Sequence, residues 1–134
     1  MYSIRALLIA ESVIQDKTTG RMSVINVLER VLPAGYPLLI PRFTLFAMLE
    51  RATEDDPRPP VNLRIFIGED EVFSDRVSID YGSTAVTRVV LEFQGFVLPK
   101  PGLLRATLTV GDASLTTYPI EAVPAGASVE VRQG

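Results

Sequence analysis

Apolar and polar positions alternate with a period of two along much of this chain. In residues 43–49 the odd positions are phenylalanine, leucine, alanine and leucine, and residues 61–67 repeat the pattern. Alternation over about four to eight residues is typical of a β-strand with one buried face. Similar runs over 73–81, 86–94 and 104–110 predict further strands, and no segment shows a convincing helical period.

The N-terminal part of the chain predicts a long hairpin. Residues 4–15 are nearly continuous apolar sequence, and residues 22–32 form a second apolar run rich in β-branched side chains. The turn sequence 16–21 separates them, and its Gly20 can take the positive φ that a hairpin loop requires. A buried amphipathic helix is the alternative for residues 22–32, but the β-branched content and the preceding turn favour a strand. We therefore expect a hairpin that is buried in part on both faces.

Prolines and glycines mark where the strands end. Residues 33–41 hold prolines that are too closely spaced for a helix or a central strand, so this segment predicts a crossing between sheets or edges. In the last strand pair, Gly111 and Asp112 supply the turn. The apolar positions then change parity near Pro119, which predicts a bulge or an edge position.

These elements predict an all-β fold, an antiparallel β-sandwich of about seven to eight strands that is immunoglobulin-like or jelly-roll-like. A closed β-barrel is the alternative. A length of 134 residues fits one domain. We expect a single β-sandwich domain over residues 1–123, followed by a C-terminal tail or edge strand over residues 124–134, with the strand near 129–131.

Three segments resemble those of a known family. They are Ala-Leu-Leu-Ile-Ala-Glu-Ser-Val at 6–13, Ser-Val-Ile-Asn-Val at 23–27 and Ile-Pro-Arg-Phe-Thr-Leu-Phe-Ala-Met-Leu-Glu at 40–50. With them the chain resembles a family of small uncharacterised bacterial proteins classed only as a domain of unknown function. The resemblance spans most of the chain and implies a small bacterial β-sandwich. Its motifs are structural, so it implies no active site.

The composition lacks the usual chemical tools of an enzyme, because the chain has no histidine, no cysteine and no tryptophan. Histidine is the commonest acid, base and metal ligand, and cysteine is the readiest nucleophile. We therefore expect no enzyme, no cofactor and no metal centre. A formal net charge of -3 offers no footprint for nucleic acid. The apolar run 6–10 is too short for a signal peptide or a membrane span, so we expect a soluble cytoplasmic protein without membrane contact.

Two acidic groups are the candidates for metal or glycosidase chemistry. Residues 54–56 and residues 69–71 with Asp75 could supply oxygen ligands to calcium, but neither group has the spacing of a calcium loop. A glycoside hydrolase needs two acids facing one cleft and aromatic platforms for the sugar, and the chain has no tryptophan. The sequence favours solvated loops for both groups.

Other polar residues offer no better catalyst. A serine or threonine nucleophile would depend on Lys17 or Lys100 as base, and both lie in predicted turns. Glu11 and Asn26 lie inside apolar runs, where we expect hydrogen-bonded core or edge positions.

Surface apolarity is the remaining signal. If the odd positions of residues 43–49 face the core, their neighbours project from the opposite face, and aromatic, methionine and arginine side chains of this kind are enriched in protein interfaces. The alternative is that the N-terminal hairpin or the crossing at residues 38–40 covers this face. The partner-interface candidates are Arg42, Phe46, Met48, Arg64 and Phe66.

The sequence therefore favours a non-enzymatic protein-interaction or scaffolding module that binds a protein partner and associates with itself as a homo-oligomer. A small-ligand or glycan-binding β-sandwich is the alternative, and it requires a concave pocket with converging polar groups. An enzyme ranks third, for want of the common acid, base and nucleophile.

Overall fold

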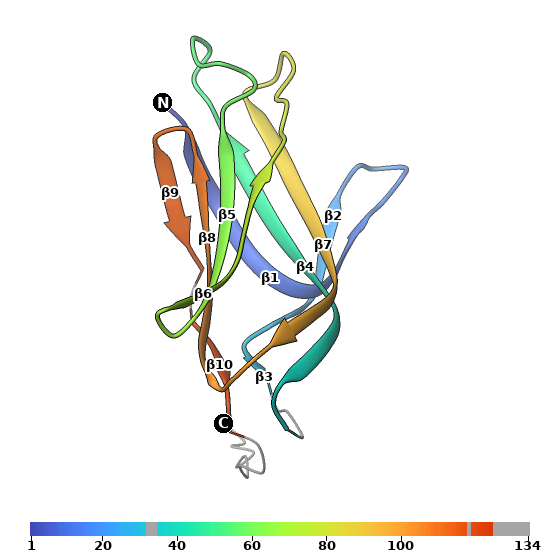
Figure 1. Cartoon of the computed structure of the whole chain (residues 1–134). Coiled ribbons are helices and arrows are strands. Elements are labelled where there is room, and N and C mark those ends of the chain that lie inside the picture. Colours follow the sequence, from blue (N-terminus) through green and yellow to red (C-terminus); the bar gives the residue numbers. More distant parts are fainter. Residues whose placement is uncertain (32–34, 118, 125–134) are drawn as a thin grey trace, which may run out of the picture.

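The structure is a computed structural model that describes residues 1–31, 35–117 and 119–124. Its strands form two facing sheets, a four-stranded sheet of order β2-β1-β4-β7 and a six-stranded sheet of order β3-β10-β8-β5-β6 with β9 paired to β8 (Figure 1). In the described residues there is no helix, so none is available to cross a membrane. The strands are β1 (Ser3–Gln15), β2 (Met22–Val27), β3 (Arg30–Val31), β4 (Leu38–Glu50), β5 (Val61–Ile67), β6 (Asp70–Val77), β7 (Val86–Leu98), β8 (Gly102–Val110), β9 (Ala113–Thr116) and β10 (Ile120–Ala122).

β5 and β8 show how the alternation builds the core. In β5 the odd-numbered side chains are at most 2% exposed, whereas Asn62 and Arg64 between them are exposed. β8 pairs antiparallel with β5 and buries every second residue from Leu104 to Val110. Because successive side chains of a strand point to opposite faces, each buried set faces the other sheet. The structure confirms the predicted all-β sandwich, and neither sheet closes on itself.

One side of the sandwich, which we call the closed side, is joined by strands that change sheets. β2 belongs to the four-stranded sheet, but the chain continues as β3, which pairs in parallel with β10 of the other sheet. The N–H of Leu28 donates to the carbonyl of Ile9 at 2.8 Å. The N–H of Glu121 donates to the carbonyl of Glu29 at 3.3 Å. Backbone hydrogen bonds therefore continue from one sheet to the other on this side.

The opposite side, which we call the open side, has no such junction. Among the described residues, β6 pairs only with β5 and β7 pairs only with β4, so these two strands are free edges. Gly95 interrupts β7 with φ +72°, and after it the even-numbered Phe96 faces the core where the odd-numbered Phe93 did before. The regular part of this edge is therefore residues 86–94.

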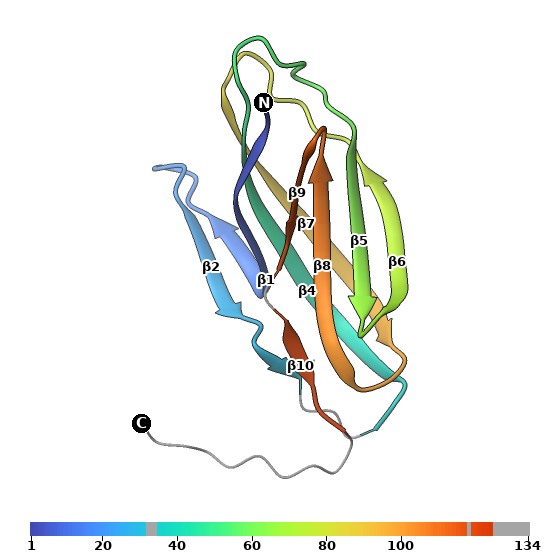
Figure 2. The ribbon, with the colours of Figure 1, turned by 90° about the vertical axis from the view of Figure 1, so that its left-hand side faces the viewer.

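The β1–β2 hairpin lies over the outer face of the four-stranded sheet. Its register, with Gln15 opposite Met22, confirms the predicted hairpin. The hairpin starts from β1, yet the carbonyl of Gly20 at its tip accepts a hydrogen bond from Arg88 of β7 at 3.1 Å. Since β4 lies between β1 and β7, the hairpin passes over β4. Figure 2 shows it standing out on the side of the molecule away from β5 and β6.

The proline-rich segment differs in part from the sequence prediction. The chain does cross from the six-stranded sheet to the four-stranded sheet between β3 and β4, as expected. β4 nevertheless begins at Leu38 and contains Pro41, which we had placed outside the strand. The register sets Pro41 against Gly95, where β7 is irregular, and such interruptions are where a strand tolerates a proline.

The register with β8 changes by one residue between β9 and β10, which agrees with the predicted change of parity near Pro119. Thr116 lies opposite Thr107, whereas Ile120 lies opposite Leu104, so one extra residue has entered between β9 and β10. The predicted tail or edge strand over 124–134 falls, after residue 124, outside the described residues.

Candidate functional site

The five predicted interface residues do not share one surface. Arg42, Phe46 and Met48 lie on β4, on the outer face of the four-stranded sheet. Arg64 and Phe66 lie on β5, on the outer face of the six-stranded sheet. The two layers of the sandwich separate these faces. The residues therefore form two distant groups and not the single patch that the alternation suggested.

Phe46 is covered by the chain itself. It lies directly opposite Leu8 of β1 and Val90 of β7, and only 6% of its surface is exposed. The β1–β2 hairpin passes over this position, and the neighbouring Met48 is half-buried. Of the two alternatives that the sequence left open, the structure has the covered face. Phe46 is therefore not available to a partner.

Arg64 and Phe66 are matched within their own sheet. The Arg64 guanidinium lies 4.9 Å from the centre of the Phe66 ring, and its Nε donates to Oε1 of Glu71 at 2.8 Å. That hydrogen bond holds the pKa of Glu71 below its ordinary value. Neither charge needs an outside partner, and an exposed pair of this kind contributes little to stability.

The open side presents a groove next to a free strand edge, with an aromatic and aliphatic floor and with Asp75, Arg76 and Glu92 also in its lining. Phe93 of β7 stacks on Phe43 with ring centres 4.7 Å apart and meets Phe73 of β6 edge-on at 5.2 Å. Phe73, Leu91 and Phe93 are only half-buried, and they line a groove of about 350 Å³ between β6 and β7. A second hollow of about 630 Å³ adjoins it at residues 76–78. Proteins bind added strands with this combination of free edge and side-chain pocket.

The two edges of the open side differ in their protection. In β6 the register with β5 shifts at Val72, so the strand bulges. Four of its eight residues are charged, namely Asp70, Glu71, Asp75 and Arg76. Over residues 86–94, β7 has neither proline, lysine nor a shift of register, and its Val86 and Val90 are 45% and 40% exposed. Bulges, proline and charged side chains, lysine above all, block edge pairing. Over residues 86–94 β7 has only Arg88 and Glu92 of these, so it is the less protected of the two edges.

A separate hollow of about 410 Å³ lies where the hairpin leaves the four-stranded sheet. In its wall, Nδ2 of Asn26 donates to Oε2 of Glu11 at 2.6 Å, which confirms the predicted hydrogen-bonded edge positions. Asn26 has φ 54°, a conformation that asparagine adopts more readily than most residues. Arg42 also lines the hollow and pairs with Glu92 at 3.1 Å. The hollow thus combines polar groups of both signs.

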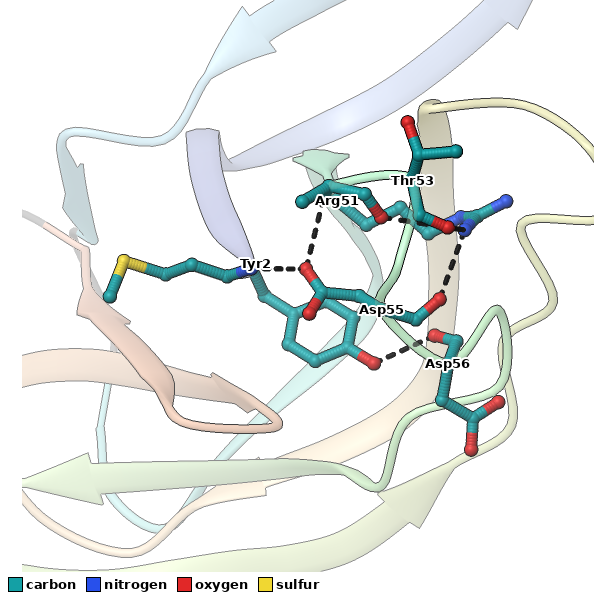
Figure 3. Close-up of polar contacts among 7 residues, drawn as sticks. Tyr2, Arg51, Thr53, Asp55 and Asp56 are labelled. Carbon is teal, nitrogen blue, oxygen red and sulfur yellow. Dashed lines mark hydrogen bonds and ion pairs between the residues drawn. The ribbon is translucent and has the colours of Figure 1, made fainter.

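Arg51 ties together the loops at one end of the sandwich, and Figure 3 shows its contacts within the β4–β5 loop. It lies at the end of β4, half-buried, with its guanidinium 5.6 Å from the centre of the buried Tyr81 ring. That guanidinium donates to backbone carbonyls of both the β4–β5 and β6–β7 loops, those of Ala52, Thr53, Asp55, Gly82 and Thr84. Arg51 is therefore a structural residue that holds together two loops, each of which runs from one sheet to the other.

The acidic part of the same loop is bound to the start of β1. The carboxylate of Asp55 accepts hydrogen bonds from the amino group of Met1 and from the N–H of Ala52, and these bonds lower the pKa of Asp55. The hydroxyl of Tyr2 donates to the carbonyl of Asp56 at 2.7 Å. These polar groups serve one another, and none of their contacts prepares a catalytic acid or base.

The two acidic groups lie at opposite ends of β5 and cannot share one ion. Residues 54–56 precede the strand, and residues 69–71 follow it. Glu71 is paired with Arg64, and Asp70 is paired with Lys100. In the part of the chain that the structure describes, no group of three or more acidic side chains is placed to hold a metal.

Sequence reasoning missed Arg51 and the β7 edge. An arginine at the end of a strand, followed by an acidic loop, was a weak signal for the first. For β7, the alternating run 86–94 was predicted as a strand, with Arg88 and Glu92 equally far from Val90. That this strand is an edge follows only from the sheet order.

Comparison with known proteins adds a family but no activity. The chain matches the family of unknown function DUF6941 over residues 5–123, most of its length, and therefore belongs to that family. A search of curated proteins gave no match. The resemblance to a family of uncharacterised proteins is thereby confirmed, and the bacterial origin stays a prediction.

Proposed function

We propose that this member of DUF6941 is a non-enzymatic protein-interaction module that binds a protein partner along the free edge of β7. One observation carries the proposal: β7 leaves a regular free edge over residues 86–94, without bulge or proline, next to a groove into which the half-buried Phe73, Leu91 and Phe93 are exposed. We expect it to act as an adaptor or scaffold in a bacterial cytoplasm, since a chain without cysteine uses no disulfide framework.

Strand addition fits both parts of this surface. The backbone N–H and C=O groups on the outer edge of β7 can form a ladder with a partner strand, which supplies affinity that does not depend on the partner's sequence. Phe73, Leu91 and Phe93 in the adjoining groove can receive the partner's alternate side chains, which supplies specificity. Both contributions come from groups that the fold leaves accessible, namely the backbone groups on the outer edge of β7 and the half-buried side chains of the groove.

The chemistry of the chain supports a binding role over a catalytic one. The sequence offers no histidine or cysteine, and the acids Asp55, Asp70 and Glu71 are each bound to a cationic group. A broad hydrolase screen checks this point. An activity that disappears when one particular carboxylate is replaced by its amide would contradict the proposal.

Affinity capture from a cell extract, with the full chain as bait, tests docking on β7. Val90→Glu places a charge in the middle of the exposed edge, and Arg64→Glu changes a charge on the opposite face as the matched control. We expect Val90→Glu to lose bound partner by about tenfold or more, because an unpaired charge in an interface costs several kcal/mol. Equal capture by both variants would show that β7 is not the docking edge.

The hollow at Glu11 and Asn26 favours a second candidate, a small-ligand site. It is concave, and it brings a carboxylate, an amide and the guanidinium of Arg42 to one place. NMR titration with small sugars and amino acids checks it. Shifts confined to the hollow that vanish in Glu11→Gln support this candidate, and no shift at millimolar ligand removes it.

A further inference from the structure

We infer that the partner strand is β7 of a second copy, paired antiparallel over residues 86–94 about a two-fold axis at Val90. This inference rests on the proposed function, because it names the partner of the same edge. The pairing would join two four-stranded sheets into one continuous sheet. A two-fold interface requires a surface that is complementary to itself, and the sequence of β7 has that property.

The symmetry of residues 86–94 carries the inference. In an antiparallel pair centred on Val90, each residue faces the one equally far on the other side of the centre. Arg88 then faces Glu92 of the other copy, and the same ion pair occurs twice. On the inner face Val89 faces Leu91, so two apolar side chains meet, and the methyl group of Thr87 faces the Phe93 ring. Directly opposed pairs of this kind stabilise a sheet, and no like charges are opposed.

Arg88 and Glu92 are placed to form ion pairs with the Glu92 and Arg88 of a second copy. Arg88 bonds to the backbone carbonyl of Gly20 and takes part in no ion pair among the described residues. The side chain of Glu92 is 48% exposed and has Arg42 on one side. Both side chains project from the outer face of the sheet, where the partner's opposite charge would lie next to them.

The inner face of β7 gains cover from the same pairing. Leu91 and Phe93 are half-buried at the edge of the core, although their strand neighbour Val89 is buried. The second copy would bring its own Val89 and Thr87 against them. The groove between β6 and β7 would then be continued by that of the second copy.

Two alternative pairings, one through the edge of β6 and one through β7 beyond Gly95, are less favourable. β6 is bulged at Val72 and highly charged, so it offers no long regular ladder. Beyond Gly95 the side chains of β7 reverse their orientation, so pairing cannot run past residue 94 in the same register. The regular stretch thus ends at equal distances on both sides of Val90.

A charge exchange tests the pairing. Sedimentation of the full chain over a range of concentrations should show a dimer at twice the monomer mass. Arg88→Glu sets a glutamate against Glu92 and should raise the dimer dissociation constant about tenfold or more. Glu92→Arg should do the same, and the double variant Arg88→Glu with Glu92→Arg should restore dimerisation to within about threefold of the parent. Arg64→Glu on the other sheet is the control and should leave the constant unchanged.

A single introduced cysteine tests the register, since the chain has none of its own. Residues that face themselves across the axis have Cα atoms about 4.5–5.5 Å apart, within the range that a disulfide spans. Val90→Cys should therefore form a crosslinked dimer on mild oxidation. Val86→Cys is equally exposed on the same strand, but its two copies would lie about 27 Å apart and should not crosslink.

The outcomes separate the two proposals. A parent that stays monomeric, a dimer unaffected by Arg88→Glu, a double variant without rescue, or crosslinking of Val86→Cys as fast as Val90→Cys overturns the self-pairing. Circular dichroism of each variant shows that it is folded before its mass is interpreted. If self-pairing fails while capture of another protein still depends on Val90, the proposed function stands with a different partner.

Discussion

The closed and open sides of the sandwich differ in how the outermost strands of the two sheets are completed. On the closed side, β2 continues as β3 into the other sheet, so backbone hydrogen bonds cover the strand ends. On the open side, β6 and β7 each end a sheet, and in the described residues no backbone ladder joins them, although Phe73 and Phe93 meet edge-on. A free edge can be protected or left open to pairing, and the two edges differ in this respect, because β6 is bulged and highly charged whereas β7 is regular over residues 86–94.

The outer face of the four-stranded sheet shows the same contrast at closer range. Phe46 and Val90 lie directly opposite each other on neighbouring strands. The hairpin covers Phe46, whereas Val90 at the edge is 40% exposed. Two apolar side chains with the same orientation therefore differ in accessibility, and only Val90 is exposed to solvent.

The largest expected effect separates these two residues. Phe46→Ala should lower the free energy of unfolding by about 3–5 kcal/mol, because it leaves a cavity under the hairpin. Val90→Ala should change it by about 0.5 kcal/mol or less in dilute, monomeric protein, because the side chain is exposed. Urea unfolding measures both. Equal losses in the two variants would show that the hairpin does not seal this face.

Two glycines with positive φ, Gly111 and Gly95, differ in how much room a Cβ would have. A Cβ on Gly111 would lie 2.5 Å from the Tyr2 ring, which is fixed by its hydrogen bond to Asp56, whereas a Cβ on Gly95 of β7 meets nothing within 4 Å. Gly111→Ala should therefore cost about 3 kcal/mol, and Gly95→Ala should cost only the backbone strain of about 1 kcal/mol. Thermal or urea unfolding checks the difference. A Gly95→Ala loss as large as that of Gly111→Ala would contradict the open space that the structure shows beside Gly95.

Arg51 offers a smaller test, because it ties the loops of the two sheets together where no strand does. Arg51→Ala should cost about 2 kcal/mol through the loss of charge-assisted hydrogen bonds to exposed and half-buried carbonyls. Arg64→Ala removes an exposed ion pair and should cost less than about 1 kcal/mol. Urea unfolding of both gives the ranking. A larger loss of stability in Arg64→Ala than in Arg51→Ala would show that Arg51 does not hold the two loops together.

The smallest expected effect is the pH dependence of stability that Asp80 and Asp16 contribute. The backbone N–H of Gly82 lowers the pKa of Asp80 in the loop between the open edges, and those of Thr19 and Thr18 lower the pKa of Asp16 in the hairpin. A lowered folded-state pKa adds stability above the ordinary aspartate pKa, and that stability is lost as the pH falls through the lowered value. Asp80→Asn should therefore be less stable than the parent at neutral pH, with the gap closing in acid. Carboxyl-carbon NMR titration measures the two pKa values directly, and ordinary values at both sites would contradict the expectation.

Much of the fold was predictable because alternation records which side chains meet water. The odd positions of β5 and the turn of the first hairpin were predicted from local pattern alone, and the structure confirms both. The extent of β4 was not, because Pro41 signals an interruption locally but is tolerated opposite the irregular Gly95 of a distant strand. Strand pairing between segments far apart in sequence leaves no trace in a single window.

The candidate site was less predictable for the same reason. Parity placed Phe46 correctly on the face opposite Leu45, but nothing in the sequence showed that a hairpin would lie over it. Arg88, Val90 and Glu92 were ordinary members of a predicted strand until the sheet order made that strand an edge.

By itself, then, the sequence determined that this chain folds into strands with one apolar face each, and that it has no histidine or cysteine to act with. The tertiary structure alone decided which apolar residues remain available to a partner. Burial on the outer face depends on where the hairpin bends and which strand ends the sheet, and both are set by contacts between residues distant in sequence, whose free energy no local pattern contains.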